Sequence, residues 1–326
     1  MDKQEKHGQA PLLFLVFNRP DTTERVLKAI KAYRPERLYV ACDGPRPGRA
    51  GEEEAVLKVR QCIADAVDWP CSLQTLYRDT NLGCKKAVSS ALDWFFEQEE
   101  RGIVLEDDCL PHPDFWRFCN ELLHRYADDE RVFMISGDNF QDGKRVNDDS
   151  YYVSSLTHIW GWAAWRRSWQ KVDLEIKGFD EWVEQGGLRR LFGLGRWEKV
   201  WVRTFERYRQ GRYNTWDYPF LFAAWKHGQY ALLPSVNLVS NIGFGHEGST
   251  HTFEDRFHQL ANIPTGSLKF PLQHPGQWNT NRSADIRTLK LKMFPTRLRK
   301  IQRLLALYLR CQISFWAILL PFFYLE

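Results

Sequence analysis

The stretch Pro11-Leu12-Leu13-Phe14-Leu15-Val16-Phe17-Asn18-Arg19-Pro20 decides how the rest of the sequence is interpreted. Its apolar run, residues 12–17, is typical of a buried strand, and the polar turn Asn18-Arg19-Pro20 ends that strand. Apolar residues between Val26 and Tyr33 then recur with the period of a helix. The stretch therefore predicts a strand, a turn and a helix in that order.

The same alternation continues through the first half of the chain. Further strands are predicted at residues 38–42, 73–77, 102–105 and 132–136, and helices at 52–66, 82–97 and 113–126, with Asn81 as the N-cap of the second. Strands of four to six residues alternating with helices of about twelve indicate an α/β fold, a mostly parallel sheet flanked by helices. Ligands bind such sheets beyond the carboxyl ends of the strands.

The second half, from Tyr151, is less regular and rich in aromatic residues. Nine of the 14 tryptophans lie between Trp160 and Trp225. Helices are predicted near residues 162–169, 197–209 and 218–226, and short strands near 230 and 236. The i, i+3, i+7 spacing of Trp162, Trp165 and Trp169 would place all three on one helical face, a pattern more typical of core. Trp160, beside Gly161, is the better candidate for a sugar contact.

Composition excludes several classes of protein. With 326 residues, 44% of them hydrophobic and 26% charged, the chain is a packed protein and not a disordered one. Seven cysteines without a C-x-x-C pair argue against a disulfide framework or a zinc ribbon and fit a reducing compartment. The polar start lacks the apolar segment of a signal peptide. No G-x-G-x-x-G or P-loop motif is present.

Three consecutive acids, Glu106-Asp107-Asp108, end the predicted strand at 102–105. Adjacent carboxylates repel one another and need a positive partner. A divalent cation with oxygen ligands, Mg²⁺ or Mn²⁺, would supply it, and such ions often bind through one or two carboxylates plus substrate phosphates. The alternative is that Asp107 and Asp108 cap the following turn.

Other polar residues at strand ends suit a nucleotide. The carboxylate of Asp43, after the second strand, can accept a hydrogen bond from a base N–H, and Arg19, Lys85 or Lys86 can bind phosphate. For the two lysines, a solvated helix face is the alternative.

Asp217, in Thr215-Trp216-Asp217-Tyr218, is a candidate general base. Aromatic neighbours should desolvate its carboxylate and raise its pKa into a useful range, and the Trp216 ring could stack on a sugar. The alternative is an N-cap for the helix at 218–226, a role compatible with the first. His246 and His251, in a Gly-rich segment, are candidates for a metal or diphosphate contact, with a plain surface position as the alternative.

Together the segments 12–20, 42–44, 78–83, 104–108, 160–162 and 216–217 resemble bacterial nucleotide-diphospho-sugar glycosyltransferases of the GT-A fold, of the N-acetylglucosaminyltransferase I type. The resemblance covers about residues 10–255. It implies a Rossmann-like GT-A domain at 10–280, with a donor half at 10–140 and an acceptor half at 150–255.

The resemblance also implies roles for the donor-side residues. Asp108 would ligate Mn²⁺, or Mg²⁺, held by the UDP diphosphate. Asp107 would face the ribose and Glu106 the donor sugar, while Asp43 would bind uracil and Arg19 would help to hold the nucleotide.

On the acceptor side, the resemblance makes Asp217 the base that deprotonates an acceptor hydroxyl for inverting attack at the anomeric carbon. His251, in preference to His246, would touch the metal or the diphosphate. Tyr218-Pro219 departs from the acidic-aromatic pair that follows the base in the relatives, and the acceptor region has no readable match.

Residues 281–326 form a basic tail. They carry nine Lys or Arg against two acids, +7, whereas residues 1–280 carry 36 against 39, or −3. Residues 289–310 combine a basic face with Leu and Ile at helical spacing, and 313–325 are almost wholly apolar, yet too few to span about 30 Å of hydrocarbon. This pattern predicts an amphipathic helix on an anionic membrane surface. A helix packed on the domain or in a dimer is the alternative.

The sequence thus predicts a metal-dependent, inverting glycosyltransferase that uses a UDP-sugar and a glycan or lipid-linked glycan acceptor. We expect it on the inner face of the cytoplasmic membrane. The alternatives are a sugar-1-phosphate nucleotidyltransferase and a non-catalytic, membrane-associated glycan-binding protein. A nucleic-acid partner is not expected, because the catalytic half is slightly acidic and shows no recognised nucleic-acid-binding fold.

Overall fold

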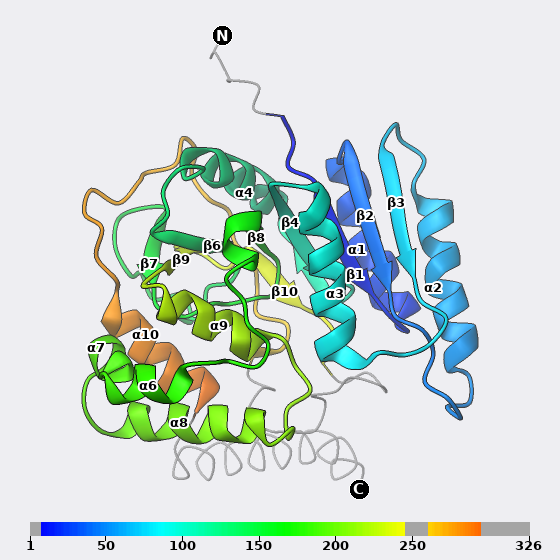
Figure 1. The fold of residues 1–326 in the computed structure, drawn as a ribbon. Helices are drawn as coiled ribbons and strands as arrows, with labels where there is room; N and C mark the ends of the chain where they lie inside the picture. The colour runs from blue at the N-terminus through cyan, green and yellow to red at the C-terminus, as the bar shows by residue number, and fades with distance from the viewer. Residues whose placement is uncertain (1–7, 245–259, 295–326) are drawn as a thin grey trace, which may run out of the picture.

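The computed structural model of the chain describes residues 8–244 and 260–294 (Figure 1). In these residues an eight-stranded sheet has the order β3-β2-β1-β4-β8-β6-β9-β7, and a small sheet pairs β10 with β5. The strands are β1 Leu12–Val16, β2 Arg37–Cys42, β3 Ser72–Tyr77, β4 Arg101–Glu106, β5 Cys109–Pro111, β6 Val132–Ser136, β7 Tyr151–Ser154, β8 Trp162–Trp165, β9 Tyr230–Pro234 and β10 Val239–Asn241. The helices are α1 Pro20–Tyr33, α2 Glu52–Ala66, α3 Gly83–Gln98, α4 Pro113–Arg125, α5 Arg166–Trp169, α6 Phe179–Glu184, α7 Gly187–Phe192, α8 Arg196–Arg209, α9 Asp217–Lys226 and α10 Arg282–Thr288, which continues into the π-helical turn η2 Leu289–Met293.

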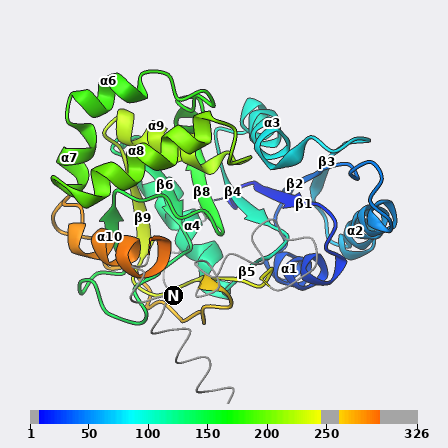
Figure 2. The ribbon, with the colours of Figure 1, turned by 90° about the horizontal axis from the view of Figure 1, so that it is seen from below.

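The first half confirms the predicted alternation of strands and helices. β1, β2, β3 and β4 are all parallel, with Phe14 of β1 paired to Val40 on one side and Leu105 on the other. All five residues of β1 are buried because both faces of the sheet are covered. Leu12, Phe14 and Val16 face one core; Leu13 and Leu15 face the other. Figure 2 shows α3 and α9 on one side of the sheet and α1 on the other.

The second half makes the sheet mixed, so the prediction of a mostly parallel sheet is wrong there. β8 runs antiparallel between β4 and β6, and β7 runs antiparallel to β9, while β6 and β9 are parallel. The backbone N–H of Gly137, after β6, donates to the carbonyl oxygen of Gly161, before β8, at 2.7 Å. β8 therefore enters the sheet at the edge where β4 and β6 end, which requires the opposite direction. The result is a Rossmann-like α/β fold with a mixed central sheet.

The predicted helix at 162–169 is also wrong. Residues 162–165 form β8, and only α5 that follows is helical. Alternation along the strand places Trp162 in one core and Trp165 in the other, instead of on one helical face. The strand predicted near residue 230 is confirmed as β9, whereas the strand predicted near 236 is wrong, because residue 236 lies between the end of β9 at Pro234 and the start of β10 at Val239.

A third hydrophobic core holds much of the tryptophan surplus. It lies among α6, α7, α8 and α9, where the Trp225 ring meets Trp201 at 4.9 Å between centroids and Phe205 at 6.0 Å. The predicted helices near 197–209 and 218–226 are confirmed as α8 and α9. The abundance of tryptophan in this region therefore serves packing to a large extent.

The beginning of the predicted tail is an integral part of the domain. α10 buries Asp285, whose carboxylate accepts from the Ser155 N–H at 2.9 Å and from Ser154 Oγ at 2.5 Å. Leu289, at the start of η2, is 0% exposed in the third core. Residues 295–326, which carry most of the predicted amphipathic segment, lie outside the described residues. In the described part of the chain, no helix has the length and apolar character needed to span a membrane.

The buried carboxyl of Asp285 should make the stability of the folded domain depend on pH. Burial raises the pKa of Asp285 to about 6, and the hydrogen bond from Ser154 opposes that rise. Because the folded carboxyl keeps its proton above the pKa of the unfolded one, the free energy of unfolding should fall as pH rises from roughly 4 to 6 and then level off. Asp285→Asn should lose this slope in urea unfolding measured across that range. An unchanged slope would contradict the assignment.

Candidate active site

Polar residues from several strands meet at the carboxyl edge of the sheet. Because β1, β2 and β4 are parallel neighbours, Arg19, Asp43 and Asp108, which follow them, lie at the same edge. In Figure 1 the loops after β2 and β3 lie toward the lower edge of the view, as do α8 and α10. The expected clustering of polar residues at this edge agrees with the topology.

Arg19 is the positive partner of the acidic run. Its Nη1 donates to Asp108 Oδ2 at 2.8 Å, and its Nη2 forms a short contact with Asp107 Oδ1. The other oxygen of Asp107 accepts from the Phe17 N–H at 3.1 Å. Burial alone would lower the pKa of Arg19, but the charges of Asp107 and Asp108 outweigh it and raise that pKa. Part of the charge compensation that the sequence assigned to a metal ion is thus supplied by the protein.

Glu106 stays largely protonated at neutral pH. Desolvation, together with the charges of Asp108, Asp107 and Asp217, raises the pKa of its carboxyl to about 8, although the charge of Arg19 opposes the rise. A protonated carboxyl can donate a hydrogen bond as well as accept one. Glu106 can therefore bind a ligand hydroxyl in either direction.

Asp217 comes from the second half of the chain but lies near the acidic run. Its charge contributes to the raised pKa of Glu106, and both carboxyls, after desolvation, help to raise the pKa of the Cys84 thiol to about 12. Asp217 is the first residue of α9, where Oδ1 accepts from the Tyr218 N–H at 2.9 Å and from Thr215 Oγ1. Trp216, and not Asp217, holds the N-cap position of that helix.

Asp43 connects the end of β2 to the start of α3. Its carboxylate accepts from the backbone N–H groups of Leu82 at 3.0 Å, Gly83 at 3.2 Å and Gly44 at 3.0 Å. Asn81, the predicted N-cap, instead donates to the Gly44 carbonyl oxygen at 2.9 Å, and Leu82 takes the cap position. Asp43 thus has a structural role, and its contact with uracil stays a prediction.

The structure directs Lys85 away from the acidic run. Its Nζ donates to the Leu174 carbonyl oxygen at 3.2 Å and to Glu175 Oε1 at 3.3 Å, and lies 4.8 Å from the centre of the Tyr208 ring. Lys85 therefore ties α3 to the second half of the chain, and this geometry does not favour the predicted phosphate contact. Lys86 is exposed.

The two tryptophans predicted to contact sugar lie in different surroundings. Trp216 is 1% exposed and packs in the core, with ring centroids 5.6 Å from Trp162 and 5.4 Å from Phe220, so it offers no free face to a sugar. Trp160 is half-buried, with its ring edge-on to Phe140 at 5.4 Å and to Phe244 at 5.6 Å. Trp160 remains the candidate. His246 and His251 lie outside the described residues.

Sequence reasoning missed a buried polar pair beside Trp160. Asp138, two residues after the end of β6, accepts from the Trp160 N–H at 3.0 Å, and its other oxygen has no hydrogen-bond partner among the described residues. Both ring nitrogens of the buried His158 also lack a partner there. Burial lowers the pKa of His158 to about 3, so its ring is neutral. The rule that selected Asp43 and Asp108, an acid within two residues of the end of a strand, would also have found Asp138.

Gly243 was not predicted as a site residue either, and its backbone packs closely against the side chains of Asp108 and Arg19. The Ile242 N–H donates to the Asp108 carbonyl oxygen at 2.8 Å. A Cβ atom on Gly243 would lie 2.3 Å from Asp108 Oδ2 and 2.6 Å from Arg19 Nη1. Only glycine lets the backbone pass this close to the ion pair.

Gly243→Ala is therefore expected to displace Asp108 and Arg19 and to lower activity by about 10²-fold, the cost of a misplacement near 1 Å. Gly276→Ala is the matched control, because a Cβ atom there meets no atom within 4 Å. Nucleotide binding and turnover of both variants, beside their melting temperatures, test this. Equal activity in the two variants would contradict the assignment.

The residues at this edge suit a divalent ion that arrives with a substrate better than a resident one. Within residues 8–244 and 260–294, no group of three or more His, Cys, Asp or Glu side chains could hold a metal. Both oxygens of Asp107 are engaged, and Glu106 is largely protonated. Asp108, with its side chain 12% exposed, is the more accessible carboxylate; its Oδ2 pairs with Arg19 and its Oδ1 lies 3.4 Å from the Cys109 thiol. A Mg²⁺ or Mn²⁺ ion bound through one carboxylate takes its other ligands from phosphates and water.

Comparison with known proteins shows no family for this chain, since no family model matches the sequence. Among solved structures, it is similar to HddC from Yersinia pseudotuberculosis, with 9% identity and a TM-score of 0.30 over 48% of this chain and 77% of that one. It is also similar to the 4-diphosphocytidyl-2C-methyl-D-erythritol synthase from Anaerococcus prevotii, with 9% identity and a TM-score of 0.33 over 69% and 88%. Likenesses of this size assign no activity.

Proposed function

We propose that this chain is a glycosyltransferase that moves a sugar from a UDP-sugar to a hydroxyl acceptor with inversion at the anomeric carbon. The observation that carries the proposal is that the segment before Asp217 packs on the start of α3, where the Lys85 N–H donates to Asn214 Oδ1 at 3.3 Å, and that the charge of Asp217 contributes to the raised pKa of Glu106. A donor-binding carboxylate and a separate base in one site are what a single displacement needs.

The chain's own residues would divide the work. Asp217, fixed at the first turn of α9 by Tyr218 and Thr215, would take the proton from the acceptor hydroxyl. Glu106, largely protonated, would hold a hydroxyl of the donor sugar. Arg19 keeps Asp107 and Asp108 in place through its two ion pairs.

Asp108 would hold a Mn²⁺ or Mg²⁺ ion brought by the UDP diphosphate. Such an ion stabilises the negative charge that develops on the departing diphosphate. Asp43 and Asp107 are proposed to face uracil and ribose, and His251 to touch the metal or the diphosphate, on the resemblance stated above. Trp160 is proposed to contact the sugar or the acceptor.

A donor screen tests this proposal. Melting temperatures in Mn²⁺ should rise with UDP-sugars more than with GDP-, dTDP- or CMP-sugars, and UDP should be released during turnover. Measurable glycan binding with no turnover of any nucleotide sugar would instead support a non-catalytic glycan-binding protein.

A sugar-1-phosphate nucleotidyltransferase is the second candidate. The name of one similar structure, a diphosphocytidyl-compound synthase, accords with this class better than with glycosyl transfer. Arg19, the cation that follows β1, forms ion pairs with Asp107 and Asp108. This pairing does not favour a contact between Arg19 and a nucleoside triphosphate, which the nucleotidyltransferase reaction would need. Only this reaction releases pyrophosphate from a nucleoside triphosphate, so a pyrophosphate assay separates the two.

The acceptor is proposed to be a glycan or a lipid-linked glycan. We also propose that the protein works at the inner face of the cytoplasmic membrane, on the basis of the +7 charge of residues 281–326 and the aromatic end of the chain. Because Leu289 belongs to the core, a truncation that tests the tail should begin after residue 294.

A further inference from the structure

The helix α10 and the turn η2 are firmly fixed to the domain by their inner face. Ala284, Asp285, Thr288, Leu289 and Lys292 are buried. Gln141, in the loop after β6, donates from Nε2 to the Ala284 carbonyl oxygen at 3.2 Å and to Thr288 Oγ1 at 2.8 Å. Lys292 forms a close ion pair with Asp142 in the same loop. The opposite face is therefore held in a fixed position.

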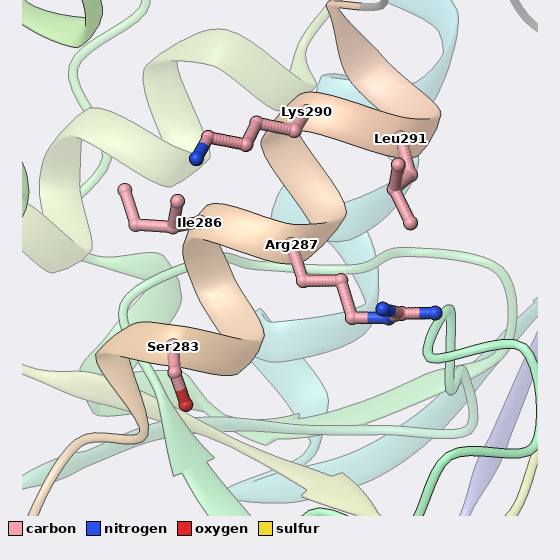
Figure 3. Close-up of a pocket in the computed structure, with 5 residues that line it drawn as sticks. All are labelled: Ser283, Ile286, Arg287, Lys290 and Leu291. Atoms are coloured by element: carbon pink, nitrogen blue, oxygen red, sulfur yellow. The ribbon is translucent and has the colours of Figure 1, made fainter.

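That opposite face lines a shallow hollow of about 460 Å³. Its residues, which we call the α10 face, are Ser283, Ile286, Arg287, Lys290 and Leu291 (Figure 3). Figure 3 shows Lys290 and Ile286 extending to one side of the helix and Arg287 and Leu291 to the other. The two cations are thus spread along the helix and do not converge on one point.

The charges on this face are incompletely balanced. Lys290 is exposed and has no ion pair with any described residue. Arg287 Nη2 lies 4.0 Å from the carboxylate of Asp142, which already pairs with Lys292. The buried Nε of Arg287 lacks a hydrogen-bond partner in the described part of the chain. Among the described residues, no acid lines the hollow. The face therefore attracts anions and repels other cations.

We propose that the α10 face docks on an anionic phospholipid surface. Separated cations interleaved with apolar side chains suit many headgroups in a plane, whereas a single phosphate would need cations that converge. The sequence that follows the α10 face has the same basic and apolar character. It contains the cations Arg297, Arg299 and Lys300, and then the apolar and aromatic segment at 313–325. The occupant is thus the lipid surface, in continuity with the basic tail.

This inference extends the proposed function, since a lipid-linked acceptor would be held at such a surface. In Figure 1, α10 lies toward the same edge of the view as the loops that follow β2 and β3.

The test measures binding of the full chain to phosphatidylcholine vesicles with and without phosphatidylglycerol. The double variant Arg287→Gln with Lys290→Gln should weaken binding to the anionic vesicles by roughly 25-fold, about fivefold for each charge. Lys290→Gln alone, which breaks no ion pair with a described residue, should weaken it about fivefold. The matched control is Lys28→Gln with Lys58→Gln, which removes the same charge from the exposed sides of α1 and α2.

Equal binding by the double variant and the control would overturn the proposal, because the tail alone would then carry the interaction. Thermal stabilisation by inorganic phosphate that the double variant loses would also overturn it, in favour of a discrete phosphate site. UDP-sugar turnover in the absence of lipid is measured in parallel and should be the same in all variants. Its absence in the unmodified chain would count against the proposed function and not against docking.

Discussion

Asp217→Asn is expected to slow sugar transfer by a factor of about 10²–10⁴, the usual contribution of a positioned general base. The amide keeps the size of the carboxyl and can still accept from the Tyr218 N–H, so α9 should begin as before. Binding of the UDP-sugar should be unchanged, because the donor is assigned to Glu106, Asp107 and Asp108. The measurement is the turnover rate beside the dissociation constant of the donor.

A matched control for this variant is Asp148→Asn, whose side chain is 92% exposed. It removes the same charge from the chain and should leave turnover unchanged. Full turnover by Asp217→Asn with intact donor binding would show that Asp217 is not the base.

Arg19→Met is expected to lower the free energy of unfolding by about 3–5 kcal/mol, the usual cost of leaving a buried charge without its partner. The charge in question is Asp107, whose side chain is 2% exposed and would keep only the Phe17 N–H. Arg19 itself is 18% exposed, so solvent screens this ion pair little. Urea unfolding at neutral pH measures the change.

The double variant Arg19→Met with Asp107→Asn separates the ion pair from the packing of Arg19. If the unpaired carboxylate causes the loss, removing its charge should restore part of the stability, giving a positive coupling between the two sites. Strictly additive losses would show that Arg19 contributes through packing alone.

Apart from the short strand β5, which was not predicted, the order and type of the elements in the first half could be predicted because local signals agreed there. Residues 12–17 formed an apolar run bounded by a turn, and the helix predicted at 52–66 has those bounds in the structure. β8 could not be predicted in the same way. Its four residues, Trp-Ala-Ala-Trp, are buried on both faces, and a short apolar run of this kind fits a strand and a helix equally.

Local sequence patterns could not predict the direction of the later strands either. It depends on where the chain re-enters the sheet, and the hydrogen bond between Gly137 and Gly161 determines that point. A sequence pattern marks a strand but not the neighbour with which it pairs.

At the site, the sequence indicated which acids end β2 and β4 but not what each one contacts. Arg19 was assigned to a nucleotide, yet in the structure it pairs with Asp107 and Asp108. Gly243 is close to Asp108 only because β10 pairs with β5, a long-range contact with no local signal. The Trp216 ring was predicted to stack on a sugar, whereas in the structure it fills the core between Trp162 and Phe220.

Phosphorus NMR of the full chain with a UDP-sugar, Mg²⁺ and a glycan acceptor tests the central claim most directly. The claim is that the acidic run and Asp217 form one site for glycosyl transfer. It predicts that UDP appears as the phosphorus-containing product, that inorganic pyrophosphate does not, and that Asp217→Asn nearly abolishes the UDP signal. Pyrophosphate release from a nucleoside triphosphate and a sugar 1-phosphate, with no UDP from any UDP-sugar, would contradict it.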